Sequence, residues 1–276
     1  MKVEKINSKN AMYQKFEVLK TNRNKRYKYQ EFLVEGVRNI NEAVKNKWKV
    51  NSFLYSKELP LSDWANDLLR SVETEVNYEL SLPLMKEISG KEDTSELLAI
   101  IKMNEDQLDE LIFSDSPIVA LFDRPSNKGN LGTIIRSCDS LGVEALLLTG
   151  HAVDLYDQDV IVSSMGSFFN MKVIRVPENQ KVFDFLDKMK KNYPTFQTIG
   201  TTAHKEHPLY SLDLTRPTMF MIGNETDGLS NAFQEYCDVL GTIPMVETSY
   251  ASSFNVGCAA TVMFYEAYRQ RFQYNI

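Results

Sequence analysis

Several features that mark other classes of protein are scarce in this sequence of 276 residues. No apolar run approaches the length of a membrane span, so we expect no contact with a membrane. The polar start, MKVEKINSKN, predicts no secretory signal. Cysteine is rare and forms no CxxC pair, which argues against a disulfide framework or a zinc site and favours a reducing, cytoplasmic location. The cysteines are Cys138, Cys237 and Cys258.

Motifs for metals and nucleotide cofactors are also missing. The histidines, His151, His204 and His207, are not spaced as metal ligands, so we expect no metal. The sequence contains no G-x-x-x-x-G-K-[ST] motif. Gly129 and Gly132 are spaced G-x-x-G, which is not the G-x-G-x-x-G of a dinucleotide site. A dinucleotide-dependent oxidoreductase is therefore disfavoured.

Charge is distributed unevenly along the chain. The net charge is −6, but residues 1–50 hold 13 basic and 5 acidic residues and so carry +8. The remainder carries −14. This asymmetry favours a basic N-terminal part that meets a polyanion, although a solvated lysine-rich surface would give the same composition.

Residues 9–30 interleave aromatic rings with basic side chains. Tyr13, Phe16, Tyr27 and Tyr29 suit base stacking, and equally suit the apolar face of a helix. The candidate RNA contacts in this part of the chain are Arg23, Lys25, Arg26, Lys28 and Arg38.

Hydrophobic patterns predict two α/β domains. Strands at 31–37, 50–56 and 96–103 with helices at 38–47 and 61–72 indicate a small domain over 1–105. Residues 106–116 are acidic and read as a linker. Over 117–276, strands at 118–123, 144–149, 172–176, 196–201, 218–223 and 238–243 alternate with helices, as in a parallel sheet covered on both faces. Those helices are expected at 131–141, 157–165, 179–191, 229–236 and 253–271.

Three glycine-bearing turns follow strands of the second domain. They are NLGTIIRSCDSLG (130–142), IGNETDGLS (222–230) and IPMVETSYASSFNVG (243–257). Ligands of open parallel sheets bind beyond the carboxyl ends of the strands, so the three turns together predict one site. The two glycines before the helix allow a tight turn, and Gly142 is expected to end the helix.

Arg136 is expected to point away from the core. Ile134, Cys138 and Leu141 form the apolar stripe of the helix, and Arg136 lies about 200° from Ile134 at 3.6 residues per turn. A solvated arginine paired with Asp139 is the structural alternative.

These turns resemble the three motifs of the SpoU (TrmH-type) branch of the SPOUT RNA methyltransferases. The motifs are N-x-G-x-x-x-R-x-x-x-x-x-G, G-x-E-x-x-G, and I-P-M followed by S-x-N-V and a long helix ending here in YEAYRQR. FLVEGVRNINEAV is similar to the ribosomal-protein-like substrate-binding domain that precedes the catalytic domain in many members. One departure is the acidic run LYDQDVIVSS (155–164), where many members carry basic residues.

The resemblance implies an S-adenosylmethionine (AdoMet)-dependent RNA 2′-O-ribose methyltransferase. It implies a homodimer formed through a catalytic domain with a deep trefoil knot. By the same analogy ribosomal RNA is favoured over tRNA as substrate. The alternatives are a tRNA 2′-O-methyltransferase and a non-catalytic RNA-binding protein of the same fold.

The resemblance also implies roles for individual residues. The catalytic set is Asn130, Arg136, Glu225, Ser253 and Asn255. The residues expected to line the AdoMet pocket are Thr201, Thr202, Ala203, Gly223, Asn224, Gly228, Ile243, Met245 and Ser253. Arg136 acts as a phosphate and oxyanion clamp or as a base, and the high pKa of guanidinium favours the clamp. Glu225 orients Arg136 or accepts a proton through water, unless it is a helix N-terminal charge before 229–236.

Overall fold

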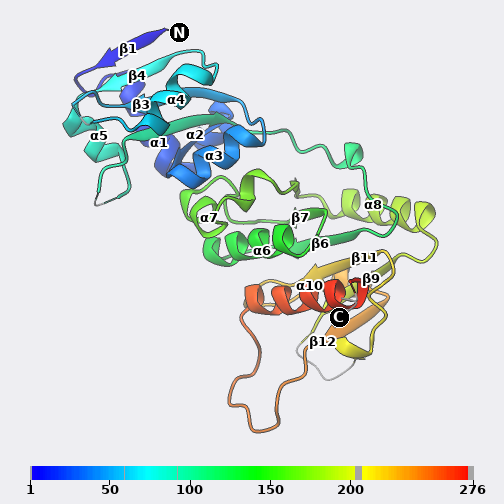
Figure 1. Cartoon of the computed structure of the whole chain (residues 1–276). Coiled ribbons are helices and arrows are strands. Elements are labelled where there is room, and N and C mark those ends of the chain that lie inside the picture. The colour runs from blue at the N-terminus through cyan, green and yellow to red at the C-terminus, as the bar shows by residue number, and fades with distance from the viewer. Residues whose placement is uncertain (1, 59, 92, 203–206, 273–276) are drawn as a thin grey trace. The chain divides into compact units, whose positions relative to one another are not determined.

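The computed structural model describes residues 2–58, 60–91, 93–202 and 207–272. Its contacts divide the chain into two compact units (Figure 1). Unit 1 comprises Met1–Glu105 and Asp154–Asn170, and unit 2 comprises Asp106–Val153 and Met171–Ile276. No helix among the described residues is long and apolar enough to span a membrane.

Unit 2 is built on a seven-stranded sheet in which every recorded pairing is parallel. The central strands are buried along their whole length, because helices cover both faces of the sheet. In spatial order the strands are β10 (His207–Pro208), β12 (Val239–Thr242), β9 (Gln197–Thr201), β11 (Thr218–Ile222), β6 (Ile118–Asp123), β7 (Ala145–Thr149) and β8 (Val173–Val176).

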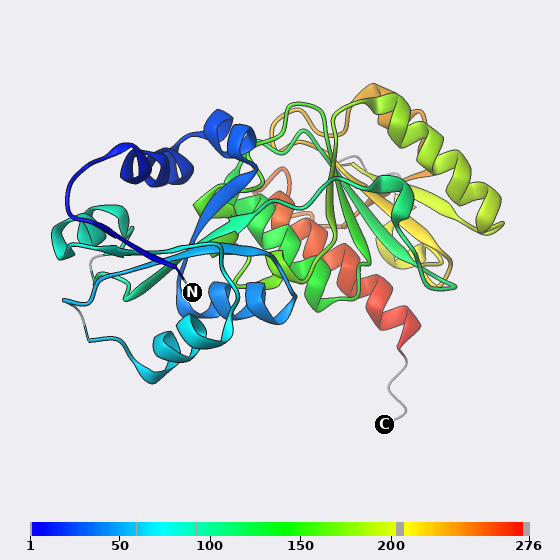
Figure 2. The same cartoon turned by 90° about the horizontal axis from the view of Figure 1, so that it is seen from above.

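Four helices belong to the layers around this sheet. They are α6 (Lys128–Ser140), α8 (Asn179–Asn192), α9 (Asn231–Gln234) and α10 (Val256–Arg271). One core cluster joins Phe185 of α8 and Phe233 of α9 to Leu121 of β6. On the opposite face, α6 and α10 lie side by side (Figure 2), and Phe264 of α10 contacts Phe220 of β11.

The first glycine turn differs from its prediction. The helix was expected from residue 131, but α6 begins at Lys128, so Gly129 and Gly132 lie inside it. Asn127 caps the helix, since its side chain accepts a hydrogen bond from Asn130 N. The predicted role of the two glycines in a turn is therefore wrong. Gly142 does adopt a positive φ of 74° just after the helix, as predicted for a residue that ends it.

Residues 106–116, predicted as a linker, belong to unit 2. The short 3₁₀ helix η1 (Leu108–Glu110) lies in this stretch, and Leu108, Leu111 and Phe113 pack on the core cluster that contains Phe185. A second 3₁₀ helix, η3 (Leu209–Ser211), follows β10.

Unit 1 contains a five-stranded mixed sheet. Its strands in spatial order are β1 (Val3–Ile6), β4 (Asn77–Leu80), β3 (Val50–Tyr55), β5 (Leu97–Lys102) and β2 (Glu31–Glu35). β5 runs antiparallel to both of its neighbours, and the other pairings are parallel. Its helices are α1 (Ala11–Thr21), α2 (Arg23–Tyr29), α3 (Val37–Lys45), α4 (Asp63–Ser71), α5 (Leu82–Ile88) and α7 (Gln158–Ser163).

The aromatic residues of the first helix belong to the core. Tyr13 and Phe16 are fully or almost fully buried, and Phe16 packs edge-on against Tyr78 at 5.0 Å between ring centroids. The base-stacking interpretation is therefore wrong for these two rings, because no base could reach them. Tyr27 is half-buried and Tyr29 is exposed.

The segment Asp154–Asn170 leaves β7, packs within unit 1 and then returns to β8. It carries α7 and the 3₁₀ helix η2 (Ser167–Phe169). Trp48 Nε1 donates to the backbone oxygen of Phe169 at 2.9 Å, and Phe32 contacts Tyr156 at 4.8 Å between ring centroids. The helix predicted at 157–165 is thus present, in unit 1.

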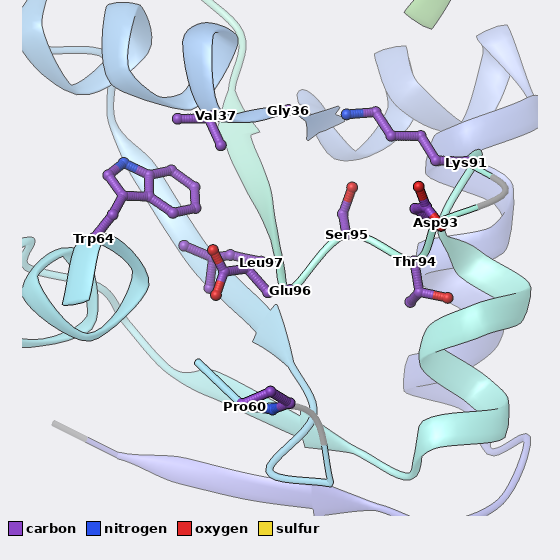
Figure 3. Close-up of a pocket in the computed structure, with 10 residues that line it drawn as sticks. All are labelled: Gly36, Val37, Pro60, Trp64, Lys91, Asp93, Thr94, Ser95, Glu96 and Leu97. Carbon is purple, nitrogen blue, oxygen red and sulfur yellow. The ribbon is translucent and has the colours of Figure 1, made fainter. Parts of the chain in front are cut away.

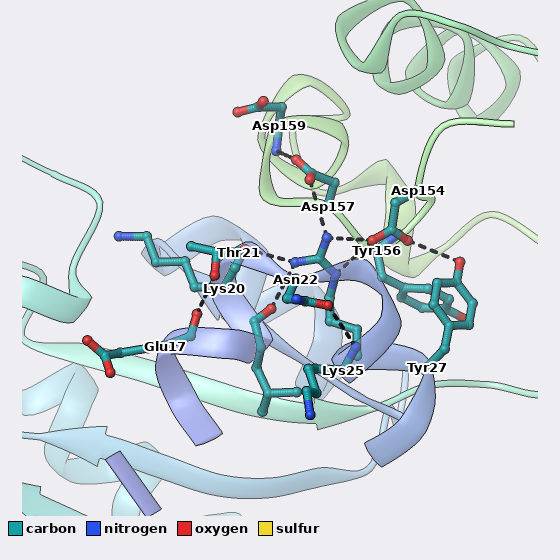
Figure 4. A network of polar contacts seen from close by, with 12 residues as sticks. Glu17, Lys20, Thr21, Asn22, Lys25, Tyr27, Asp154, Tyr156, Asp157 and Asp159 are labelled. Carbon is teal, nitrogen blue, oxygen red and sulfur yellow. Dashed lines mark hydrogen bonds and ion pairs between the residues drawn. The ribbon is translucent and has the colours of Figure 1, made fainter. Parts of the chain in front are cut away.

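A buried ion pair also holds this segment. Arg26 is only 1% exposed, and its Nε and Nη2 atoms donate to Asp154 Oδ2 at 2.7 and 2.5 Å. Nη2 also reaches Asp157, while Nη1 donates to the carbonyls of Leu19 and Lys20 in the last turn of α1. Figure 4 shows Asp154 and Asp157 gathered with Tyr27, whose hydroxyl donates to Asp154 at 3.0 Å. All five donors of the guanidinium are therefore used inside the protein.

The predicted RNA contact of Arg26 is wrong for this reason, since a buried and fully bonded guanidinium cannot meet a phosphate. Its acidic partners are Asp154, just before the acidic run that departs from the family pattern, and Asp157 within that run. The four other candidate RNA contacts, Arg23, Lys25, Lys28 and Arg38, are exposed.

We expect Arg26→Ala to lower the free energy of unfolding of unit 1 by about 3–5 kcal/mol, because it leaves the Asp154 carboxylate buried without its charge partner. Urea unfolding followed by tryptophan fluorescence measures this, since Trp48 and Trp64 both lie in unit 1. Lys28→Ala, an exposed position on the same helix, should change the value by no more than about 0.5 kcal/mol. Equal losses in the two variants would contradict the assignment.

Candidate active site

Three chain segments meet beyond the carboxyl ends of parallel strands in unit 2. β6 ends at Asp123, its neighbour β11 ends at Ile222, and β12 ends at Thr242. Each strand is followed by one of the three glycine-bearing segments. The chain visits β7 and β8 on one side of β6 before it forms β9, β11 and β12 on the other, and a crevice is expected at such a change of direction.

Glu225 lies at the centre of this meeting point. Its Oε2 accepts hydrogen bonds from the backbone N and the Oγ of Ser126, at 2.9 and 2.6 Å. Its Oε1 accepts from Asn127 N at 3.0 Å and from Asn130 Nδ2 at 3.3 Å. The carboxylate thus binds the chain just before α6 and the first turn of that helix. It is not the N-terminal charge of the following helix, which was the structural alternative.

Asn130 continues this network to the third segment. Asn255 Nδ2 donates to Asn130 Oδ1 at 3.0 Å. The other side-chain atom, Asn255 Oδ1, accepts from the backbone N of Gly257 and of Cys258 and so caps α10. The chain of bonds Glu225–Asn130–Asn255 therefore connects one residue from each of the three predicted motifs.

The protonation state of Glu225 follows from its partners. Partial burial by itself would raise the pKa of its carboxyl, but the hydrogen bonds from the side chain and backbone of Ser126 and from Asn130 outweigh it. The net effect is a pKa below the ordinary value, so the group is ionised at neutral pH.

The second glycine turn is compact. Asn224 and Gly228 exchange two backbone hydrogen bonds, both of 3.0 Å, and Gly228 has a φ of 69°. A Cβ on Gly223 would lie 2.1 Å from the backbone N of Leu229, so no other residue fits there. Asn224 Oδ1 accepts from the backbone of Thr226 and Asp227, which closes the turn.

A cleft of about 250 Å³ opens beside these turns. It combines backbone and hydroxyl groups with apolar side chains such as Met263 and Val256. Among the residues predicted to hold the cofactor, it is lined by Thr201, Thr202, Gly223, Asn224, Gly228, Ile243, Met245 and Ser253. Ala203 lies outside the described residues. Glu225 also lines the cleft.

Arg136 is not brought to this cleft within its own chain. It is exposed on α6, as predicted, and it makes no hydrogen bond or ion pair with any residue that the structure describes. The pairing with Asp139, which was the structural alternative, is not observed. Asn130 lies six residues earlier, which places the two side chains about 120° apart around the helix. Glu225 therefore orients Asn130 and not Arg136.

Sequence reasoning missed several supporting residues. Ser126 and Asn127 present the amides that bind Glu225, and the signal was a Ser-Asn pair just before a helix. Asp123 is 2% exposed and accepts from Ser230 N at 3.0 Å and Thr149 Oγ1 at 2.9 Å. The sequence signal for Asp123 was an aspartate at the end of an otherwise apolar strand.

The described residues contain no group of three or more histidine, cysteine or acidic side chains placed to bind a metal.

Comparisons with known proteins agree on one family. Residues 117–265 match the model of the SpoU rRNA Methylase family, and residues 10–99 match the SpoU L30e-like domain. The chain is 41% identical to a 23S rRNA (uridine(2479)-2′-O)-methyltransferase of Streptomyces viridochromogenes, over 97% of this chain and 92% of that protein. It is 26% identical to 23S rRNA (guanosine(2553)-2′-O)-methyltransferase RlmP of Bacillus subtilis, over 87% of this chain and 89% of the relative.

A solved structure shows the same fold over nearly the whole chain. It is the SpoU methyltransferase AviRb from Streptomyces viridochromogenes in complex with AdoMet. It is similar to this chain with a TM-score of 0.89 and 42% identity, covering 95% of this chain and 98% of that one.

Replacing Glu225 by Gln tests the central carboxylate. The pKa of Glu225 is lowered in the folded protein, so its ionised carboxylate stabilises the fold. This contribution is complete at pH values above the ordinary carboxyl pKa of 4.5, and it is lost as the pH falls through the folded-state pKa. We expect Glu225→Gln to lower the free energy of unfolding by about 1–2 kcal/mol at neutral pH, because an amide turns a donor toward Asn127 N or Ser126 N.

The difference between the two proteins should shrink as the pH falls below the ordinary carboxyl pKa of 4.5. Urea unfolding followed by far-ultraviolet circular dichroism at several pH values measures it. Glu247→Gln, an exposed position in the same unit, is the matched control. A constant difference at every pH would show that the charge of Glu225 is not what stabilises the turn.

Proposed function

The chain belongs to the SpoU rRNA methylase family, and we propose from that premise that it transfers a methyl group from AdoMet to a ribose 2′-hydroxyl of ribosomal RNA. The observation that carries the proposal is the bonded series Glu225–Asn130–Asn255 at the edge of a cleft. The series joins one residue of each motif beside that cleft, which favours catalysis over a non-catalytic RNA-binding protein of this fold. Both relatives named above act on 23S rRNA, which favours this RNA over tRNA.

The cleft suits AdoMet by its chemistry. AdoMet combines an adenine, a ribose and an amino acid, and the cleft offers apolar side chains, hydroxyls and backbone groups together. Gly223 has no side chain, so the backbone of Gly228 and Leu229 packs directly against it. One wall of the cleft is therefore formed by backbone. We infer that Thr201, Gly223 and Ile243 are among the residues that hold the cofactor.

AdoMet supplies an electrophilic methyl group on a sulfonium. The residues of the chain must position the ribose and assist loss of the 2′-hydroxyl proton as the new bond forms. Asn130 and Asn255 orient each other, and their fixed amides are suited to bind the ribose. Glu225 already accepts four hydrogen bonds, so we assign it to positioning and not to proton transfer.

Arg136 is the candidate for contact with the RNA backbone. Its guanidinium is exposed and makes no bond to a described residue, so its planar set of donors is available for a phosphate. A contact next to the target ribose would also stabilise the oxyanion as it develops. Ser253 lines the cleft close to Asn255 in sequence and is proposed to complete the catalytic set.

The association of two chains is proposed from α10. Cys258, Val262 and Tyr265 are exposed at positions i, i+4 and i+7, so they form one stripe along the helix. Val262 is 40% and Tyr265 is 54% exposed. Such a stripe beside α6 is suited to pack on a second copy of the chain. The trefoil knot and the cytoplasmic location stay predictions.

The catalytic proposal is tested by methyl transfer from labelled AdoMet to 23S rRNA transcribed in vitro, with tRNA transcripts for comparison. We expect transfer to the ribosomal transcript, at 2′-hydroxyls identified by protection from alkaline cleavage. Arg136→Ala should lower the rate by about 100-fold or more while the dissociation constant for AdoMet changes by less than about twofold, because the side chain lies outside the cleft. Isothermal titration calorimetry measures the dissociation constant for AdoMet.

Arg136→Lys should recover little activity, because a lysine keeps the charge and loses the planar pair of donors. Lys172→Ala, an exposed position in the same unit, is the control. Near-normal turnover by Arg136→Ala would contradict the role assigned to Arg136 and leave the proposed function standing. Absence of AdoMet binding at millimolar ligand would overturn the proposed function itself.

The dimer is tested by the double variant Val262→Glu/Tyr265→Glu. Two charges on the proposed contact face should convert a dimer into single chains, because each would be buried against apolar surface. Light scattering reads the mass directly. A wild-type protein with the mass of one chain would exclude the dimer, and a variant that stays dimeric would place the contact elsewhere.

A further inference from the structure

Arg124 has a backbone conformation that an arginine rarely adopts. It follows β6 directly and has a φ of 50°, in the left-handed region that favours glycine. Strain of this kind persists only where the surrounding structure holds it. Here the backbone N of Arg124 donates to Thr149 O at 3.2 Å, and its backbone O accepts from Asn224 Nδ2 at 2.6 Å. Neighbouring strand ends and the turn after β11 therefore fix this backbone.

The guanidinium of Arg124 bridges two parts of unit 2. Its Nη2 donates to the backbone O of Gly228 at 3.0 Å, in the turn after β11. Its Nε donates at 3.1 Å to Asp123 Oδ2, which also accepts from Ser230 N at 3.0 Å. Nη1 lies 3.8 Å from Asp227 Oδ2. The side chain thus connects the end of β6 to the glycine turn at several points.

Gly150 leaves room for this side chain. It follows β7, has a φ of 59°, and a Cβ placed on it would lie only 2.7 Å from Arg124 Cγ. Because Cγ is close to the backbone, it could not give way without moving the rest of the side chain. The position of the guanidinium therefore depends on a glycine at residue 150.

The turn that Arg124 holds borders the cofactor cleft. Gly223, Asn224 and Gly228 line that cleft, whereas Arg124 and Gly150 are not among its lining residues. Any influence of Arg124 on a ligand in the cleft must therefore pass through the turn.

We propose that Arg124 is a positioning residue, which fixes the turn after β11 in the conformation that binds AdoMet. Gly228 has a wide choice of backbone conformations, and the bond from Arg124 to its carbonyl selects one of them before the ligand arrives. The inference rests on the proposed function, and it adds a residue that lies outside the three motifs.

A simpler role for Arg124 would be to neutralise Asp123, which is only 2% exposed. A lysine would supply that charge equally well. The observed arrangement uses the forked shape of guanidinium, since Nε binds Asp123 while Nη2 binds the Gly228 carbonyl. Substitution by lysine therefore separates the two roles.

A second cleft, of about 590 Å³, lies in unit 1 and is shown in Figure 3. Its lining includes Val37, Trp64 and Leu97. Every bonding partner that the structure describes for Arg124 lies in unit 2. AdoMet held in the cleft of unit 1 would therefore not respond to Arg124, and AdoMet held beside the glycine turn would.

The test is isothermal titration of full-length variants with AdoMet, each shown by circular dichroism to be folded at the temperature used. Arg124→Gly keeps a residue that accepts the positive φ and removes the guanidinium. We expect its dissociation constant for AdoMet to rise by about tenfold, the equivalent of one charged hydrogen bond. Its kcat at saturating AdoMet should fall by less than about threefold, because the loss is one of cofactor binding.

Arg124→Lys should bind AdoMet as weakly as Arg124→Gly, because one ammonium cannot serve both Asp123 and the Gly228 carbonyl. Wild-type affinity in Arg124→Lys would show that neutralisation of Asp123 is the whole role, and the proposal would fail. Lys172→Ala, an exposed position in the same unit, is the control for loss of a cation.

Gly150→Ala tests the same route from a residue outside the cleft. It should raise the dissociation constant for AdoMet by about tenfold in the wild-type background and leave it unchanged in the Arg124→Gly background, since the clash is then gone. Gly142→Ala is the matched control, because Gly142 also has a positive φ and its Cβ would meet nothing within 4 Å. An equal effect of Gly150→Ala in both backgrounds would contradict the proposal.

These outcomes are distinct from failure of the proposed function. If the wild type binds no AdoMet at millimolar ligand, the proposed function fails and the positioning role fails with it. If the wild type and Arg124→Gly bind AdoMet with the same dissociation constant, only the role of Arg124 is wrong.

Discussion

The candidate active site depends on one carboxylate. Glu225 joins the turn after β11 to the beginning of α6, two segments separated by almost one hundred residues of chain. Through Asn130 it extends this connection to the cap of α10. The hydrogen bonds that hold it also lower its pKa, so the anion and the turn stabilise each other. Without that anion the backbone amides of Ser126 and Asn127 would lose their acceptors.

Steric constraint supports the same geometry. Gly223 has the backbone of Gly228 and Leu229 directly against it, so the turn after β11 closes onto itself without a side chain between. Asp123 binds Ser230 N from the end of β6 and ties the far side of that turn to the neighbouring strand. The cleft is therefore framed by backbone held at both ends, which suits a site that must present fixed donors and acceptors to a ligand.

Much of this arrangement could be predicted from the sequence. The apolar run IVALFD is buried on both faces, and the strand found there has the predicted bounds. β1 and β4 could not be predicted, because VEKI and NYEL are short, mix polar with apolar residues and gain their stability from pairing with each other. The burial of Arg26 was equally hidden, because its partner Asp154 is 128 residues away and only the fold brings the two together. Local pattern predicts elements, whereas partners of this kind depend on tertiary structure.

The hydrogen bonds beside the cofactor cleft bear on what unit 2 can recognise in its RNA substrate. Beside the cofactor cleft, both side-chain atoms of Asn224 are bonded within its own turn and to Arg124, and both oxygens of Glu225 are occupied. These groups hold the site together and have little capacity left to read a base edge. Unit 2 is therefore better suited to fix the ribose than to recognise the base.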